Sequence, residues 1–325
     1  MNTEHVDGVT LGLVLPAFDE PARIYAAARM ADVQHFHSVW APDATLPGYP
    51  WLDSLAVLGG VVAVTTQVQV GTSIFVLARR NPVLLAHTVA TLDYLSGGRF
   101  ILGVGVGERA LRPNEFAVAG VPLQERGRIT DEYLRLFQRL FTETAVTHEG
   151  KYFTGDALTI EPKPVRPGGI PFWIGGRADA SLRRAAALGT GWIPTLITPD
   201  DFGQGWTQLG EYARAAGRDP AQITGAIHVF AAIGRSYEAA ASVLAPGIEA
   251  IFHTSFAHFA PLCVVGTAAQ WVEQIGRFAT AGVRHVNVLL YTHDLIGDVQ
   301  QIGEEVIPHL REFGRTHHAE TPPGK

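Results

Sequence analysis

The chain has 325 residues, of which 47% are apolar, so it can bury a large hydrophobic core. A net charge of −6 and the lack of a lysine- or arginine-rich cluster argue against nucleic acid as a partner. A single cysteine, Cys263, excludes an internal disulfide framework and fits a reducing compartment. Because neither a signal peptide nor a membrane-length apolar run is visible, we expect a cytoplasmic protein that does not enter a membrane.

Short apolar strands alternate with amphipathic helices along the whole chain. The predicted strands span residues 9–15, 38–41, 67–76, 99–106, 170–175, 191–194, 223–233 and 284–291. The predicted helices span residues 20–33, 51–64, 82–95, 124–141, 178–188, 199–216, 267–281 and 297–313. Strands that are each followed by a helix indicate parallel crossover connections. The sequence therefore predicts an α/β fold of the (β/α)8 TIM-barrel type, in preference to a doubly wound open sheet.

The chain is expected to form a single barrel domain over residues 1–325, with two insertions. Residues 142–169 include a stretch in which polar and aromatic side chains alternate about a glycine, which suggests a hairpin. Residues 236–262 are rich in alanine, histidine and phenylalanine, and we expect extra helices there. Both insertions would decorate the barrel without forming a second domain.

The predicted strand at residues 99–106 has an unusual glycine pattern. Gly103, Gly105 and Gly107 occupy every second position, so one face of the strand carries no side chains. Such a face admits a flat ligand or another backbone, although glycines that only relieve crowding inside a barrel explain it equally well. A dinucleotide-binding Rossmann motif is rejected, because its glycines open a helix, whereas residues 111–115 are predicted to form an irregular loop.

In barrels of this type the active site lies at the carboxyl ends of the strands. Candidate side chains and turns at these ends are Asp43, Thr72, Ser73, Ile74, Gly107, Glu108, Gly175, Gly176, Arg177, Thr195, His228 and Tyr291. The turn from Gly175 to Arg177 leads into a helix, whose free N–H groups would form an anion site unless the glycines only make a tight turn. His228 falls in mid-strand and is interpreted as a core histidine. No histidine pair has metal-ligand spacing, so no metal site is expected.

Several motifs in combination resemble the bacterial luciferase-like monooxygenase superfamily. They are the segments at residues 97–107, 125–132, 161–164, 172–176 and 191–193. The resemblance extends over residues 9–315 and is closest to the branch that uses coenzyme F420, a 5-deazaflavin, with FMN as the alternative cofactor. It implies a homodimer that acts on a small organic molecule.

The resemblance also implies where the cofactor binds. The deazaflavin ring would lie in the barrel mouth against the third and fourth strands, where Gly105 and Gly107 are candidate contacts. Family members commonly have a cis non-prolyl peptide at the end of the third strand, which corresponds here to residues 72–74. The turn at residues 175–177 matches the phosphate-binding turn, and Thr195 ends a neighbouring strand. Glu108 matches a carboxyl group that donates or accepts a proton in some deazaflavin dehydrogenases.

One position departs from the family pattern. Family members often have Asp-His after the second strand, whereas this chain has Asp43 followed by Ala44. An alanine cannot exchange a proton, so the sequence favours reduction of a C=C or C=N bond over alcohol oxidation by the histidine route. Asp43 remains a candidate for catalysis or for a hydrogen bond to the cofactor, and a cap of the following turn is its structural alternative. A reduced-FMN monooxygenase and a non-catalytic flavin-binding barrel are the alternative functions.

Overall fold

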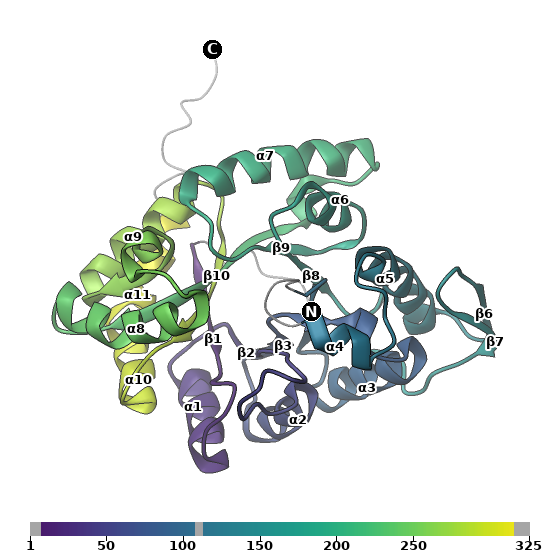
Figure 1. Cartoon of the computed structure of the whole chain (residues 1–325), viewed down its shortest axis with the longest axis horizontal. Coiled ribbons are helices and arrows are strands. Elements are labelled where there is room, and N and C mark those ends of the chain that lie inside the picture. The colour runs from purple at the N-terminus through teal and green to yellow at the C-terminus, as the bar shows by residue number, and fades with distance from the viewer. Residues whose placement is uncertain (1–7, 108–112, 315–325) are drawn as a thin grey trace.

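The computed structural model describes residues 8–107 and 113–314, and its centre is a closed barrel of eight parallel strands (Figure 1). In barrel order the strands are β1 (Thr10–Val14), β2 (Ser38–Ala41), β3 (Gln69–Thr72), β5 (Phe100–Gly105), β8 (Phe172–Gly175), β9 (Gly191–Ile193), β10 (Thr224–Ile233) and β12 (His285–Leu290). Neighbouring strands pair in parallel, and β12 closes the ring by pairing with β1. The predicted TIM-type barrel is confirmed.

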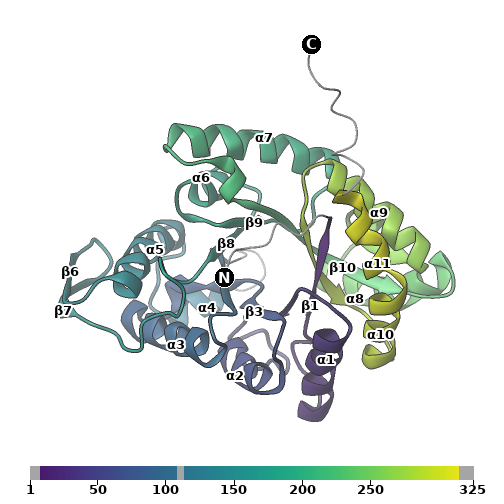
Figure 2. The ribbon, with the colours of Figure 1, turned by 180° about the vertical axis from the view of Figure 1, so that it is seen from behind.

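Helices surround the barrel in both views of the ribbon (Figures 1 and 2). They include α1 (Pro21–Val33), α2 (Ser54–Val64), α3 (Pro82–Leu95), α5 (Arg126–Thr142), α6 (Asp179–Leu188), α7 (Pro199–Ala215), α9 (Ala268–Thr280) and α10 (Leu295–Glu305). Local capping explains where several begin: Asp53 and Asn81 accept backbone N–H bonds at the starts of α2 and α3. Within the described residues, no helix is long and apolar enough to cross a membrane.

The structure adds short elements that the periodicity of the sequence did not predict. The third predicted strand is divided into β3 and β4 (Phe75–Val76), and the loop expected at residues 111–115 contains the start of helix α4 (Pro113–Val118). The last predicted helix is interrupted after Glu305 and continues as α11 (Ile307–Leu310) and the 3-10 helix η5 (Arg311–Gly314). Pro308 lacks a backbone N–H and lies in the first turn of α11, which favours a new start there.

Two excursions leave the barrel. Between α5 and β8, strands β6 (Val146–Glu149) and β7 (Thr154–Leu158) pair as an antiparallel hairpin, which projects beyond α5 in both views (Figures 1 and 2). After β10 come helix α8 (Tyr237–Phe252) and two 3-10 helices, η3 (Phe256–His258) and η4 (Ala260–Leu262). They lead to strand β11 (Val264–Gly266), which pairs with the end of β10 outside the ring. A three-residue strand is too short to show a hydrophobic period.

The glycine-bearing face of β5 receives a neighbouring part of the chain. A Cβ atom added to Gly103 would lie 1.8 Å from the carbonyl oxygen of Thr72, at the end of β3. At Gly105 and at Gly175 of β8, an added Cβ would lie 2.1 Å and 2.4 Å from Cδ1 of Ile74. The missing side chains therefore make room for the segment that follows β3.

Substituting Gly103 by alanine tests this close approach. The added methyl group would meet a backbone carbonyl, which cannot rotate away as a flexible side chain would. We expect Gly103→Ala to lower the free energy of unfolding by at least about 1–3 kcal/mol, the usual cost of overpacking a core. Denaturant-induced unfolding followed by circular dichroism would measure the difference from the wild-type chain.

Gly59 in α2 supplies the matched control. An added Cβ there meets no atom within 4 Å, and the position is helical. Gly59→Ala should leave stability unchanged or raise it by about 0.5–1 kcal/mol. Equal stability of the Gly103→Ala and Gly59→Ala variants would show that the close approach to Thr72 is unimportant.

Candidate active site

The barrel mouth, meaning the end at which the parallel strands finish, contains the segment that follows β3. The peptide between Ser73 and Ile74 is cis, as the family resemblance predicted. Thr72 and Ser73 are buried, and the Thr72 hydroxyl donates a hydrogen bond to the carbonyl of Gly103 at 2.8 Å. Ile74 is half-buried and lies beside Gly105 and the end of β8. Ile74 is therefore the most exposed of the three predicted cofactor contacts in this segment.

A chain of hydrogen bonds runs through the barrel interior and ends at this segment. The hydroxyl of Ser73 lies 2.9 Å from Nδ1 of His228, and the Asn287 amide donates to the same hydroxyl at 3.4 Å. Oδ1 of Asn287 lies 2.7 Å from Nε2 of His285. Nδ1 of His285 in turn lies 2.7 Å from the hydroxyl of Thr10 on β1. The barrel core is therefore crossed by a continuous polar chain whose side chains come from three strands, β1, β10 and β12, and from the end of β3.

Two features accommodate this chain in an apolar interior. Gly12 leaves the required space, because an added Cβ would lie 2.3 Å from Oδ1 of Asn287. Ser38 also contacts Nε2 of His285 at 3.1 Å and accepts a hydrogen bond from the Trp40 indole at 2.6 Å. Each side chain of this polar chain thus has a hydrogen-bond partner inside the barrel, which limits the cost of its burial.

Burial also sets the charge of the two histidines. It lowers the pKa of His228 to about 4. The pKa of His285 falls to about 3, chiefly through burial and also through repulsion from His37. Both rings are therefore neutral near neutral pH. His228, interpreted from the sequence as a core histidine, is hydrogen-bonded to Ser73 at the end of β3.

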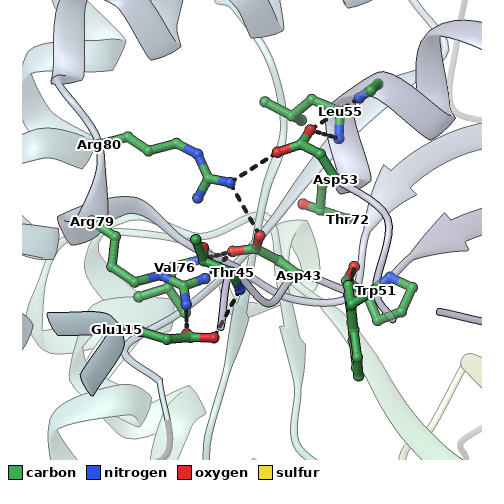
Figure 3. A network of polar contacts seen from close by, with 12 residues as sticks. Asp43, Thr45, Trp51, Asp53, Leu55, Thr72, Val76, Arg79, Arg80 and Glu115 are labelled. Carbon is green, nitrogen blue, oxygen red and sulfur yellow. Dashed lines mark hydrogen bonds and ion pairs between the residues drawn. The ribbon is translucent and has the colours of Figure 1, made fainter. Parts of the chain in front are cut away.

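Asp43 is held in a network of ion pairs behind the β3 segment (Figure 3). Its carboxylate accepts hydrogen bonds from the backbone N–H of Val76 at 3.1 Å and from the guanidinium of Arg79. Arg80 lies 3.4 Å from the other carboxylate oxygen and also pairs with Asp53 at the start of α2. The Asp43 side chain is fully buried. These contacts favour an anchoring role for Asp43 over the catalytic role considered from the sequence.

Glu115 of α4 completes the network from the opposite side. It forms an ion pair with Arg79 in which both side chains are only 3% exposed. Its other oxygen accepts hydrogen bonds from the backbone N–H groups of Thr45 and Leu46 at 2.8 Å and 2.9 Å. Glu115 therefore joins the loop after β2 to α4 (Figure 3). Glu115 was not among the candidates predicted from the sequence, although Pro113 followed by a glutamate is a recognised helix-start signal.

The turn after β8 presents backbone N–H groups at the mouth. Gly176 has a φ of +103°, a conformation that favours glycine. Helix α6 begins after Ala178, with no side-chain hydrogen bond capping its N-terminus. Arg177 is exposed and donates to the carbonyl of Leu196 at 2.5 Å. The uncapped helix start and the adjacent guanidinium could together hold an anionic group.

Aromatic side chains lie next to His228. The ring of Phe230 is 6.0 Å from His228, 6.0 Å from Phe252 and 6.2 Å from Tyr291. Phe252 belongs to α8 and stacks on Phe259 at 4.5 Å. Burial raises the pKa of the Tyr291 hydroxyl to about 12, so the group stays neutral. The segment after β10 thus builds an apolar wall beside the polar chain, a feature that its sequence did not reveal.

Two further candidates from the sequence, Gly107 and Thr195, fall at the edge of the described site. Glu108 lies outside the described residues, so its proposed proton-transfer role stays a prediction. Gly107 has a φ of +76°, and an added Cβ there would lie 2.7 Å from the ring of Phe116 on α4. Thr195 is exposed beyond the end of β9 and forms a single parallel bridge with His228.

Comparisons with known proteins agree with this architecture. The family model described as Luciferase-like monooxygenase matches residues 3–261. The 5,10-methylenetetrahydromethanopterin reductase of Methanopyrus kandleri is 25% identical, with 94% of this chain and 99% of the reductase covered. The F420-dependent glucose-6-phosphate dehydrogenase of Kineococcus radiotolerans is 32% identical over 64% of this chain and 63% of the dehydrogenase. A solved F420-dependent secondary alcohol dehydrogenase, in complex with an F420-acetone adduct, superposes with a TM-score of 0.83 at 23% identity. This last comparison covers 93% of this chain and 99% of the dehydrogenase.

The buried Arg79–Glu115 pair yields a stability prediction. Glu115→Gln preserves the shape of the side chain but removes the charge that faces Arg79. We expect the free energy of unfolding to fall by about 3 kcal/mol, because breaking a buried ion pair leaves a charge without full compensation. Denaturant titration of the variant and the wild-type chain would measure the loss.

An exposed ion pair provides the control for this substitution. Glu273 pairs with Arg277 one turn along α9, and both side chains are 66% exposed. Glu273→Gln should change the stability by no more than about 0.5 kcal/mol, as is usual for surface pairs. If Glu115→Gln cost no more than this control, Glu115 would not anchor the loop after β2.

Proposed function

The chain belongs to the luciferase-like monooxygenase family of flavin and deazaflavin oxidoreductases, and from this membership we propose that it is an F420-dependent oxidoreductase. It would transfer hydride between coenzyme F420 and a small organic substrate. The favoured reaction is the reduction of an activated C=C or C=N bond. Relatives whose names specify F420 support this choice of cofactor.

The observation that carries the proposal is the open start of helix α6 at the barrel mouth. Backbone N–H groups at a helix start attract phosphate, and the α6 start has no side-chain cap to compete for them. Gly176 allows the chain to turn there, and Arg177 adds a positive charge beside it. These donors fit the phosphate of a phosphorylated planar cofactor.

The end of β3 would support the cofactor ring. Ile74 is the half-buried side chain of the segment, and it has Gly105 and Gly175 on its inner side. The ring would therefore pack on Ile74 rather than directly on these glycines. When bound, the deazaflavin supplies the hydride, and the part of the chain is to hold the ring and the substrate together and to exclude water.

The surroundings of β2 support reduction over alcohol oxidation. Ala44 is 6% exposed and offers no exchangeable proton. The carboxylate of the preceding Asp43 is engaged by two arginines and a backbone N–H. A proton for the reduced product would come from Glu108, as the sequence motif suggests, or from water.

Titration with the two candidate cofactors tests the assignment. We expect coenzyme F420 to bind more tightly than FMN, because the proposal places the chain in the deazaflavin-using branch. Fluorescence quenching of each cofactor by the purified protein would give both dissociation constants. Binding of FMN without measurable binding of F420 would contradict the proposal and favour the reduced-FMN monooxygenase.

Substitution of Gly176 tests the proposed phosphate site. Gly176→Asp would place a carboxylate beside the start of α6 and should weaken cofactor binding at least tenfold, or about 1.4 kcal/mol. Gly176→Ala is the matched control, because it adds the same Cβ at the same positive φ without the charge. Circular dichroism would check that both variants fold. Equal affinity of the Asp and Ala variants for the cofactor would mean that no anion binds there.

A further inference from the structure

His228 has one nitrogen engaged inside the barrel and the other available at the mouth. Its backbone N–H bonds to the carbonyl of Pro194 at 2.9 Å, which places it level with Thr195, beyond the end of β9. The ring is half-buried, and its Nδ1 contacts the Ser73 hydroxyl. Among residues 8–107 and 113–314, no hydrogen bond engages Nε2. This atom is therefore free to meet a bound molecule.

The orientation of Asn287 determines which nitrogen of His228 carries the proton. Its amide presents Oδ1 to His285 and Nδ2 to Ser73, so the Ser73 oxygen accepts a hydrogen bond from the amide. Within the described residues the Ser73 hydroxyl contacts no acceptor other than Nδ1 of His228, so we assign its single proton to a hydrogen bond to that nitrogen. A neutral imidazole that accepts at Nδ1 carries its hydrogen on Nε2. The polar chain thus makes Nε2–H a donor that has no hydrogen-bond partner among the described residues.

The surroundings keep this donor neutral. Burial depresses the pKa of His228 well below neutrality, and no carboxylate hydrogen-bonds to its ring in the part of the chain that the structure describes. The nearest linked titratable group is His285, which is itself neutral. Phe230 packs edge-to-face against the ring and belongs to the aromatic wall. Such surroundings suit an apolar molecule that offers one hydrogen-bond acceptor.

We propose that the Nε2–H of His228 donates a hydrogen bond to the carbonyl oxygen of an apolar α,β-unsaturated substrate, with Ser73 as the positioning residue. The inference rests on the proposed function and names its substrate class. A hydride from reduced F420, which would thereby be oxidised, adds to the β-carbon with two electrons, and the π electrons of the C=C bond move toward the oxygen to form an enolate. The hydrogen bond stabilises that negative charge, and water then protonates the α-carbon. His228 keeps its own proton throughout.

The tautomer is tested first, on the ligand-free protein. Nitrogen-15 NMR of histidine-labelled chain at pH 7 should show His228 as a single neutral tautomer with hydrogen on Nε2, assigned by the loss of its signals in His228→Phe. Ser73→Ala should convert it into a mixture of tautomers. Ser54→Ala is the matched control, because Ser54 is buried and its hydroxyl has no hydrogen-bond partner within the described residues, and it should change nothing. Hydrogen on Nδ1 in the wild-type chain, or an unchanged Ser73→Ala spectrum, would overturn the proposal.

Turnover tests the substrate class, with reduced F420 and cyclohex-2-enone as the probe. His228→Phe keeps a ring but removes both nitrogens, and kcat should fall about 100-fold, as when an oxyanion donor is lost. The affinity of His228→Phe for F420 should stay within about twofold of the wild-type value. His228→Gln, which retains an N–H donor, should recover part of the lost kcat.

Wild-type kcat in His228→Phe would overturn the catalytic role. Failure of the wild-type chain to reduce the enone while F420 binds would overturn the carbonyl assignment, whereas failure to bind F420 would instead refute the proposed function.

Discussion

The close approach of the β3 end to β5 is the constraint on which the site depends. The Thr72 carbonyl and the Ile74 side chain occupy space that any residue larger than glycine would take at Gly103 and Gly105. Because these positions are bare, the chain after β3 can lie within the barrel wall. That placement directs Ser73 toward the barrel interior and leaves Ile74 at the mouth. The polar chain and the proposed cofactor platform are thus two consequences of one packing arrangement.

The barrel interior combines this packing with polar side chains that each have at least one hydrogen-bond partner. An apolar interior would strongly penalise an unpaired imidazole or amide, yet each member of the chain from Thr10 to His228 has a partner. The same burial removes charge from both histidines. A neutral, fixed polar group beside an aromatic wall is well suited to orient a substrate, because it need not reorganise when charge develops during a reaction.

The loops at the mouth are held by a separate set of interactions. Arg79 pairs with Asp43 on one side and with Glu115 on the other, so the loop after β2, the turn after β4 and helix α4 are joined behind the mouth. Two carboxylates share one buried guanidinium, with a second arginine at the edge. Removing one member would leave the charges of the others uncompensated, so we expect this network to maintain the geometry of the site.

The sequence by itself determined the barrel, because the features that predict it are local. Apolar periods locate the eight strands and most of the helices to within a few residues, and glycine spacing identified β5 as the strand that something must approach. The family motifs also located the cis peptide after β3. Short elements such as β4 and β11 were not predicted, since two or three residues are too few to show a hydrophobic period.

Only the tertiary structure decided how the candidate side chains are used. Ser73 and His228 are 155 residues apart, and Ser73 and Asn287 are 214 apart, so no local pattern could show that they touch. The sequence presented Asp43 as a site residue with a turn cap as the alternative, and its pairing with Arg79 and Arg80 became visible only in the fold. Likewise, the glycine face of β5 could have received a ligand, and it receives Ile74 instead. Strand and helix positions follow from the order of neighbouring residues, whereas the chemistry of the mouth follows from contacts that exist only once the barrel has closed.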